Sequence, residues 1–385
     1  MSKNIFCPDG VEFKKLGDIC EFNRGTSLTS ARAVAGEIPV ISGGLKPAFY
    51  HNISNRPAGC ITVAGSGSAG YVSFWEVPIF CADSFTVDPK NTNEILSKYL
   101  YYYLTNIQEE IYRRKSPGPI PHIYGKNLAD FMIPLPPLEV QREIIRILDK
   151  FTELTRELTR ELELRKKQYN YYRDKLLTFD NSIKWVTIEE LFDIRTGYTP
   201  SKRNDSYWEN GVVPWFRMDD IRMNGRILSS AMQKISLEAV KNRPFPANSL
   251  IISTSATIGE HALITVDFLA NQRFTCLTIK KEFESECDIM FAFYYCYELK
   301  KLCLQNLNHG HFDSVDMKKF RLFRFPLPPI EEQQRISAIL DKFDSLCNSI
   351  TSGIPAEINA RRKQYEYYRD KLLTFKQIDS ELTQH

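Results

Sequence analysis

The sequence predicts an α+β protein in which two globular domains are joined by two long helices that pair as a coiled coil. Three observations lead to this prediction. A long segment occurs twice, a heptad pattern of apolar residues runs through it, and short apolar runs between turn residues fill the rest of the 385-residue chain. The first two observations indicate paired helices, and the third indicates sheets.

The repeated segment covers residues 134–179 and 326–375. The first copy begins PLPPLEVQREIIRILDKF and ends RKKQYNYYRDKLLTF, and the second begins PLPPIEEQQRISAILDKF and ends RRKQYEYYRDKLLTF. Pro134 matches Pro326 at an offset of 192 residues, whereas Phe179 matches Phe375 at an offset of 196. The second copy therefore carries four extra residues in its middle.

Apolar and aromatic residues in each copy are spaced alternately by four and three, which is the spacing of a coiled-coil seam. About forty helical residues would make a rod of roughly 60 Å. Such a rod with one apolar face is unstable alone in water, so the second copy is the expected partner of the first. A helix buried in one globular domain is the alternative, and the unbroken length argues against it. The expected seam consists of Ile144, Leu148, Phe151, Leu158, Leu162, Tyr169, Tyr172 and Leu176 in the first copy and of Ile336, Leu340, Phe343, Ile350, Tyr365, Tyr368 and Leu372 in the second.

The four extra residues of the second copy lie near Ser352, Gly353 and Pro355. Four residues are close to one helical turn, so the seam is expected to keep facing its partner. Because Gly favours a helix C-terminus and Pro a first helical position, we expect a kink or a short break here. The first copy has instead the tandem repeat Thr155–Leu158 and Thr159–Leu162, each unit worth about one turn, or roughly 6 Å.

The composition is that of a soluble globular protein, with 43% hydrophobic and 25% charged residues. No apolar run is long enough to span a membrane, and the first residues do not resemble a signal peptide. Nine cysteines without a C-x-x-C pair indicate reduced thiols and a cytoplasmic location. The net charge of +3 neither requires nor excludes a nucleic-acid partner.

The expected organisation alternates globular and helical parts. The parts are a first domain (1–133), a first helical region (134–180), a second domain (181–325), a second helical region (326–378) and a tail (379–385). In the first domain, residues 11–22 form a helix or a strand, strands are expected at 38–42, 59–64, 71–75, 79–81 and 85–87, and residues 95–112 are helical.

The second domain repeats the order of the first with little sequence identity. Residues 213–216 correspond to 38–41, Ala270-Asn271 to Ala82-Asp83, Gly310 to Gly118 and Val315 to Ile123. The helical copies are nearly identical while the domains have diverged. This contrast favours two different readers on a common spacer, and hence a target with two different parts.

Two motifs have residue types that occur in ligand-binding sites. Gly65–Gly70 matches G-x-G-x-x-G, but strand-forming residues follow it where a dinucleotide fold needs a helix, so we expect a hairpin, either structural or close to a ligand. Asn308–Asp313 contains two histidines without a second ligand cluster, which favours a polar loop over a metal site. No Walker loop, H-E-x-x-H motif or nucleophile elbow is present, which argues against an autonomous enzyme.

Polar side chains in the two domains are candidates for contacts with DNA, because basic and amide groups bind guanine and adenine edges. Each is also compatible with a solvated surface position. The candidates are Arg24, Arg32, Lys46, Ser66, Ser68, Arg113, Arg114, Lys115 and His122 in the first domain and Lys202, Arg203, Arg217, Arg222, Asn271, Gln272, Arg273 and His311 in the second.

The chain resembles the specificity (S) subunits of type I restriction-modification systems. The resemblance covers nearly the whole chain and is most specific in the two helical copies, with further likeness in residues 23–25, 41–44 and 65–70. It implies two target recognition domains, each reading one half of a split, asymmetric double-stranded DNA site. It also implies that the two helices pack antiparallel with pseudo-twofold symmetry, act as a spacer and dock two methyltransferase (M) subunits.

The resemblance implies further that this chain catalyses nothing. The methyltransferase subunits would carry S-adenosylmethionine and methylate adenine, restriction (R) subunits would join the complex, and ATP and Mg²⁺ would be used by the partners. Residues outside the seam are candidates for docking these partners, namely Tyr171, Arg173, Asp174, Tyr367, Arg369 and Asp370. The alternatives are a coiled-coil scaffold that binds proteins, a nucleotide-dependent enzyme using Gly65–Gly70, and a DNA reader for a methyltransferase without restriction.

Overall fold

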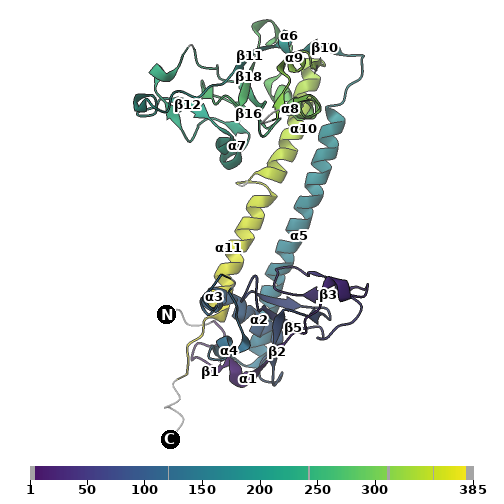
Figure 1. The fold of residues 1–385 in the computed structure, drawn as a ribbon, viewed down its shortest axis with the longest axis vertical. Helices are drawn as coiled ribbons and strands as arrows, with labels where there is room; N and C mark the ends of the chain where they lie inside the picture. The colour runs from purple at the N-terminus through teal and green to yellow at the C-terminus, as the bar shows by residue number, and fades with distance from the viewer. Residues whose placement is uncertain (1–4, 120, 242, 310–312, 350, 379–385) are drawn as a thin grey trace. The chain divides into compact units, whose positions relative to one another are not determined.

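The computed structural model describes residues 5–119, 121–241, 243–309, 313–349 and 351–378 (Figure 1). The chain divides into two compact units, unit 1 with residues 1–160 and 357–385 and unit 2 with residues 161–356. Each unit therefore contains one mixed α/β module and parts of the long helices. Among the described residues, no helix has the length and apolar character needed to cross a membrane.

The module of unit 1 is built from short strands and helices. In chain order it contains β1 (Glu12–Lys15), α1 (Leu16–Ile19), β2 (Cys20–Arg24), η1 (Ser30–Arg32), β3 (Ile38–Ile41), β4 (Phe49–His51), β5 (Cys60–Ala64), β6 (Val72–Trp75), β7 (Phe80–Cys81), β8 (Ser84–Pro89), α2 (Ser97–Asn106), α3 (Gln108–Arg113), α4 (Gly125–Leu128) and β9 (Met132–Leu135). The strands form sheets in the orders β2-β8-β5-β6, β4-β3-β7 and β1-β9.

The core of this module lies between the larger sheet and α2. All five residues of β5 are buried, which suits a β-rich strand with a neighbour on each side. Helix α2 packs against β5 and β6, and Tyr99 and Leu104 join Ile61 and Val63 in one apolar cluster. The segment 11–22, expected as a helix or a strand, is in fact strand, short helix and strand.

The expected helix over residues 95–112 is interrupted, which corrects the prediction. Helix α2 ends at Asn106 and α3 begins at Gln108, with Ile107 at φ −98° and ψ 23° between them. Gln108 donates a hydrogen bond of 2.7 Å to the Gly70 carbonyl and accepts one of 3.1 Å from the Val72 amide. The break therefore accompanies a tie to the β5–β6 hairpin, a contact that local sequence does not predict.

The module of unit 2 repeats this plan with additions. It contains β10 (Lys184–Thr187), α6 (Ile188–Leu191), β11 (Phe192–Thr196), η2 (Asp205–Tyr207), β12 (Val213–Phe216), α7 (Met218–Asn224), β13 (Ile227–Leu228), β14 (Lys234–Ile235), η3 (Leu237–Ala239), β15 (Ser249–Ser253), β16 (His261–Ile264), β17 (Leu269–Ala270), β18 (Phe274–Ile279), η4 (Lys281–Phe283), α8 (Ile289–Gln305), β19 (Leu307–Asn308), β20 (Ser314–Val315), α9 (Met317–Arg321) and β21 (Arg324–Leu327).

Its sheets have the orders β11-β18-β15-β16-β13, β14-β12-β17, β10-β21 and β19-β20. Helix α8 takes the place of α2 and α3 but continues without a break for 17 residues. Asp288 caps its first turn by accepting a 2.8 Å hydrogen bond from the Phe291 amide. The two modules thus share their order of elements, and α7 and β13 extend the second one.

Helix α5 (Leu138–Leu176) is continuous for 39 residues and is visible as one rod in Figure 1. In unit 1, its first part pairs with α11 (Ile354–Leu373): Phe151 stacks on Tyr368 at 5.5 Å, and Leu148 is buried in one cluster with Leu372. In unit 2, its second part pairs with α10 (Ile330–Asn348), where Tyr169 stacks on Phe343 at 6.2 Å. The predicted fold class, mixed modules with long paired helices, is confirmed.

The pairing within unit 1 is antiparallel, since contacts move backwards along α11 as they move forwards along α5. The same holds in unit 2, where Tyr172 stacks on Phe343 while the earlier residues Arg165 and Lys166 lie near the later residue Cys347. Two aromatic residues of the seam stay partly exposed, since Tyr172 remains 38% exposed and Tyr368 36% exposed.

The predicted break in the second helical copy is confirmed. Helix α10 ends at Asn348 and α11 begins at Ile354, with Pro355 in its first turn. A side chain on Gly353 would place its Cβ 2.4 Å from the Ser345 carbonyl oxygen, so only glycine fits this turn. Ile350, which was expected in the seam, lies outside the described residues.

Eight of the nine cysteines are buried. Cys7 is half-buried, while Cys20, Cys60 and Cys81 in unit 1 and Cys276, Cys287, Cys296, Cys303 and Cys347 in unit 2 lie in the interior. Burial raises the pKa of Cys276 to about 12. These thiols therefore behave as small apolar side chains.

Candidate nucleic-acid interface

The ends of β3 and β5, the link between β7 and β8, and the segment before α4 meet in unit 1, and we call this region the loop edge of unit 1. It consists of residues 41–44 at the end of β3, 65–70 after β5, 82–83 between β7 and β8, and the described residues 116–119 and 121–124. The Ala82 amide donates a 2.7 Å hydrogen bond to the Ile41 carbonyl, and the Ile123 amide donates one of 3.0 Å to Gly65. Backbone hydrogen bonds thus hold these loops to one another.

Unit 2 has the same backbone frame at its own loop edge, formed by residues 216–217, 254–259, 271–273 and the described residues 307–309 and 313–315. The Asn271 amide donates to the Phe216 carbonyl at 3.1 Å, and the Val315 amide donates to Thr254 at 2.9 Å. The correspondence of Val315 with Ile123 is therefore confirmed. The position of Gly310 lies outside the described residues.

One correspondence predicted from the sequence is wrong by a residue. In the parallel pairings, Ile41 lies opposite Cys81, and Phe216 lies opposite Ala270. Asn271 therefore corresponds to Ala82 and not to Asp83. The link in unit 2 is also one residue longer, because the hydrogen bond that Gly65 donates to Asp83 is made in unit 2 from Thr254 to Arg273.

Each frame depends on a glycine that directly follows a strand, Gly25 after β2 and Gly197 after β11. A Cβ atom on Gly25 would lie 2.3 Å from the Ala82 carbonyl oxygen, and one on Gly197 would lie 2.3 Å from that of Ala270. Real Cβ atoms do not come so close to an oxygen. Glycine at these two positions therefore allows the backbone to pass directly beneath the link.

The side chains at the loop edge of unit 1 surround a pocket of about 310 Å³. Arg24 and His122, both predicted from the sequence, line it together with Asp83 and Lys126, which were not predicted. The His122 ring stacks on Tyr124 with 6.3 Å between centroids and 13° between planes. The pocket thus brings cationic, acidic and aromatic groups together on an open surface.

Ser66 and Asp83 form a pair at this edge. The Ser66 hydroxyl donates a short hydrogen bond to Oδ2 of Asp83. The Ser68 amide donates one of 2.8 Å to the Gly43 carbonyl, so both predicted serines lie on the rim of the edge. The expected hairpin is confirmed, since β5 and β6 are antiparallel neighbours and Gly67 and Gly70 have φ of 62° and 85° between them.

The remaining candidates of unit 1 are more dispersed. Lys115 lies over the Tyr112 ring at 3.9 Å, and Arg114 lies over Phe131 at 5.2 Å. Arg32 is exposed on η1, and Lys46 and Arg113 are exposed on loop and helix. None of these five lines the pocket.

At the loop edge of unit 2, Gln272 and Arg273 are exposed and Asn271 is half-buried. The Gln272 side-chain oxygen accepts a short hydrogen bond from the Thr199 hydroxyl. Arg217 directly precedes α7 and follows Phe216, whose carbonyl is bonded to Asn271 of the link 271–273. Its guanidinium lies 5.7 Å over the Trp215 ring. The structure thus brings four of the predicted residues together.

The other candidates of unit 2 lie apart from the link or outside the described residues. Arg222 is near the end of α7 and lines a separate cleft of about 930 Å³ with Lys166, Arg173 and Arg226. Lys202 and Arg203 are exposed in the turn before η2. His311 lies outside the described residues, and no metal-ligand cluster occurs among the described ones.

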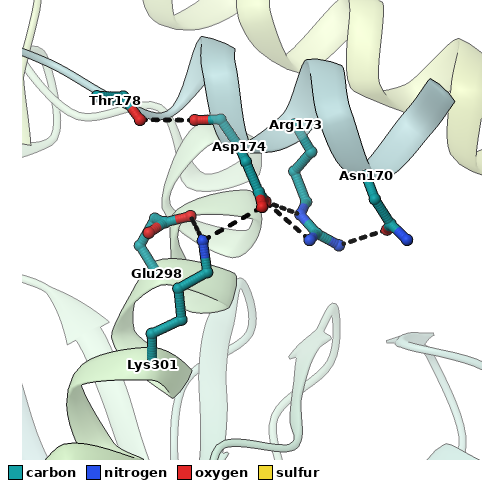
Figure 2. A network of polar contacts seen from close by, with 6 residues as sticks. All are labelled: Asn170, Arg173, Asp174, Thr178, Glu298 and Lys301. Atoms are coloured by element: carbon teal, nitrogen blue, oxygen red, sulfur yellow. Dashed lines mark hydrogen bonds and ion pairs between the residues drawn. The ribbon is translucent and has the colours of Figure 1, made fainter. Parts of the chain in front are cut away.

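Two residues considered for partner docking are instead engaged within unit 2, as Figure 2 shows. Arg173 is bonded to Asp174 at 2.8 Å and to Asn170 at 3.1 Å, and Asp174 also pairs with Lys301 of α8 at 3.4 Å. Burial alone would raise the pKa of Asp174, but the hydrogen bond from Arg173 and the charge of Lys301 hold it below its ordinary value. In unit 1, Arg369 and Asp370 form the same pair at 2.8 Å.

Comparison with a protein-family model gives two matching regions, each of which contains one module. The type I restriction modification DNA specificity domain matches residues 8–164 and 182–360. The chain belongs to the family of type I restriction-modification specificity subunits. Two specificity subunits of Escherichia coli are similar in sequence. The EcoR124I/EcoR124II specificity subunit is 35% identical over 95% of both chains, and the EcoprrI specificity subunit is 50% identical over 54% of this chain and 54% of its own.

Solved structures of the family have the same fold. The S subunit of the M. genitalium type I system superposes with a TM-score of 0.61 at 17% identity, covering 94% of this chain and 96% of that one. A structure described in terms of complex assembly and conformational transition of the type I R-M system gives a TM-score of 0.63 at 18% identity, covering 94% and 97%. The fold of this chain, with long paired helices and two α/β modules, is thus shared with these two structures.

Sequence reasoning overlooked Asp83 and Lys126 at the pocket of unit 1. Both were passed over because an acidic residue and an isolated lysine carry no motif. The available sequence signal is that Asp83 lies between two β-rich apolar runs. In the structure Cys81, Ala82 and Ser84 are buried while Asp83 is exposed.

Proposed function

We propose that this specificity subunit binds double-stranded DNA with both modules, each reading one half of a split, asymmetric site. The observation that carries the proposal is the contrast between frame and side chains. Equivalent backbone hydrogen bonds hold both loop edges, yet one presents Arg24, Asp83 and His122 and the other presents Arg217, Gln272 and Arg273. Equal scaffolds with unequal side chains suit two different base sequences.

We also propose that the paired helices set the unread gap between the half-sites. Helix α5 is continuous from Leu138 to Leu176 and has residues packed in the cores of both units. The tandem Thr-Arg-Glu-Leu units lie within this continuous stretch, so a change of one unit changes helix length by about 6 Å.

The helices are also the proposed docking surface for two methyltransferase subunits. Tyr171 and Tyr367 occupy equivalent positions in the two copies. Tyr171 is 62% exposed and Tyr367 is 54% exposed, and neither packs in a core cluster. Exposed aromatic residues that recur in identical surroundings suit two copies of one partner. Arg173 and Asp174 are less suited than their counterparts, because Arg173 also lies 4.4 Å over the Tyr297 ring and Asp174 also pairs with Lys301 of α8.

The chain itself is proposed to be non-catalytic. S-adenosylmethionine would be bound by the methyltransferase subunits, and ATP and Mg²⁺ would be used by the complex with restriction subunits. A DNA reader for a methyltransferase alone, without restriction, is the nearest alternative. A protein-binding scaffold is the more distant one and predicts no DNA affinity with a steep salt dependence.

The test is coexpression with the cognate methyltransferase subunit in a methylation-free host, followed by genome-wide mapping of N6-methyladenine. We expect a split asymmetric motif with a fixed gap. Exchanging residues 1–133 for those of another specificity subunit should change one half of the motif only. An assembled complex that binds S-adenosylmethionine but leaves the genome unmethylated would contradict the proposal.

A further inference from the structure

The link between β7 and β8 holds one exposed residue in a rigid setting. Ala82 and Ser84 are 6% and 4% exposed, and Asp83 projects between them into the open pocket. The Ser84 hydroxyl donates a 2.8 Å hydrogen bond to the Ser42 carbonyl, and the Ala82 amide is bonded to Ile41. A side chain mounted in this way has a fixed position with little backbone freedom to lose on binding.

The carboxylate of Asp83 is only partly used by the protein. Its Oδ2 atom accepts the hydrogen bond from Ser66, which fixes the orientation of the group. A carboxylate has about four acceptor sites on two oxygens, so acceptor capacity remains on the exposed side. Arg24 and Lys126 line the same pocket, and such side chains commonly contact phosphate groups. Their positive charge offsets the repulsion between an acidic residue and DNA.

We infer that Asp83 reads a base in the half-site of unit 1 by accepting a hydrogen bond from an exocyclic amino group in the major groove. Only cytosine and adenine present such a donor there, whereas guanine and thymine present acceptors that a carboxylate repels. The inference rests on the proposed DNA-binding function and names the chemical class of base that this position selects.

The equivalent link of unit 2 supports this assignment by its opposite chemistry. Gln272 and Arg273 stand there, and their amide and guanidinium groups are donors for adenine and guanine edges. The same frame thus presents an acceptor in one module and donors in the other. We therefore expect different bases at the corresponding positions of the two half-sites.

The test compares Asp83→Asn, Asp83→Arg and Ser66→Ala, each coexpressed with the methyltransferase subunit. Asp83→Asn can still accept the Ser66 hydrogen bond, so the loop is retained while the free acceptor loses its charge and a donor is added. We expect it to accept more than one base at a single position of one half-site, and Asp83→Arg to shift that position toward guanine. The other half-site and the gap stay unchanged. Glu21→Gln, an exposed acid on β2 outside the pocket lining, is the matched control.

Binding of the purified complexes to duplexes with each of the four bases at that position gives the magnitude of the base preference. The wild-type complex should prefer cytosine or adenine by roughly tenfold or more, and the two duplexes show which of them is read. Asp83→Asn should reduce that preference severalfold, and the binding assay reports it even if methylation is lost. Ser66→Ala should reduce the preference less than Asp83→Asn does, because the charged carboxylate remains although its orientation is no longer fixed.

Two outcomes overturn the inference. One is a wild-type base preference at every position in the Asp83→Asn complex. The other is the same change from Ser66→Ala as from Asp83→Asn, which would make Asp83 a support for the loop. Either result leaves a split methylation motif intact, whereas failure of the proposed function removes the split motif in the wild-type complex.

Discussion

Tyr294 of α8 donates a 2.6 Å hydrogen bond to Asp341 of α10. This contact ties the module of unit 2 to its helix pair. Burial and then the neighbouring Asp341 carboxylate raise the pKa of Tyr294 above its ordinary value. In unit 1, Tyr102 donates a 2.5 Å hydrogen bond to Asp149 of α5, so the same tie occurs twice.

We expect Tyr294→Phe to lower the free energy of unfolding by about 1–2 kcal/mol, because a hydrogen bond to a charged group is lost. Urea denaturation followed by tryptophan fluorescence measures the loss. Tyr102→Phe is the matched variant and should cost less, since Asp149 also pairs with Lys98 at 3.0 Å. Equal midpoints for wild type and Tyr294→Phe would show that this tie adds nothing to stability.

Gly25→Ala should disrupt the loop edge of unit 1. The new Cβ would lie 2.3 Å from the Ala82 carbonyl oxygen, so the link that carries Asp83 must move. We expect a loss of about 2 kcal/mol or more in stability and a loss of sequence discrimination in one half-site. Gly44→Ala is the control, because its Cβ would meet the nearest atom at an ordinary 3.6 Å. An unchanged methylation motif in Gly25→Ala would argue against a rigid link.

His261 predicts a dependence of stability on acidic pH. The residue is completely buried, and burial together with nearby Arg226 lowers its pKa to about 3. In the unfolded chain, its pKa is about 6.5. Below that value the unfolded state binds a proton that the folded state does not bind, so stability falls as the pH decreases from about 6.5 toward 3. The slope from this residue is at most about 1.4 kcal/mol per pH unit.

The matched variant is His261→Val, since Val72 occupies the corresponding position of unit 1 in the same strand register. Urea midpoints measured between pH 4 and pH 8 should fall less steeply toward acid in this variant, whatever its stability at pH 8. A curve parallel to that of the wild type would mean that His261 is protonated equally in the folded and unfolded states.

Deleting Thr159–Leu162 should shorten the unread gap while leaving both half-sites unchanged. The deletion removes about one turn from α5, or roughly 6 Å, which corresponds to about one or two base pairs. Mapping of N6-methyladenine in the coexpression host reads the gap directly. Replacing these residues with four alanines is the control, because it keeps the helix length. A deletion variant that methylates sites with the original gap would disprove the role of α5 as a spacer.

Local sequence was sufficient for the paired helices and insufficient for the details of the modules. A heptad pattern is a local property, so the helices and their pairing followed from it, and the break followed from Gly353 and Pro355 in the inserted residues. The break at Ile107 follows from the contact of Gln108 with Gly70, which are far apart in the chain. Such contacts are not encoded in any short window of residues.

The loop edges show the same limit. Basic and amide residues could be proposed from their chemistry, and Asn271, Gln272 and Arg273 do lie together at one edge. Asp83 was overlooked because its proposed role depends on the burial of its neighbours and on the pocket that Phe22, Arg24 and residues 122–126 help to line. Asn271 can be matched with Ala82 only from the register of the parallel strands. The sequence alone does not show this match, because the two links differ in length.

The buried cysteines give this protein a set of natural reporters. Three lie in the core of unit 1 and five in unit 2, so a thiol reagent can reach them only when the surrounding unit opens. The rate of alkylation at each site, identified by mass spectrometry of peptides, would therefore measure the opening of each unit separately. Bound DNA or an M subunit that holds one unit closed would be seen as slower labelling in that unit alone, without any engineered probe.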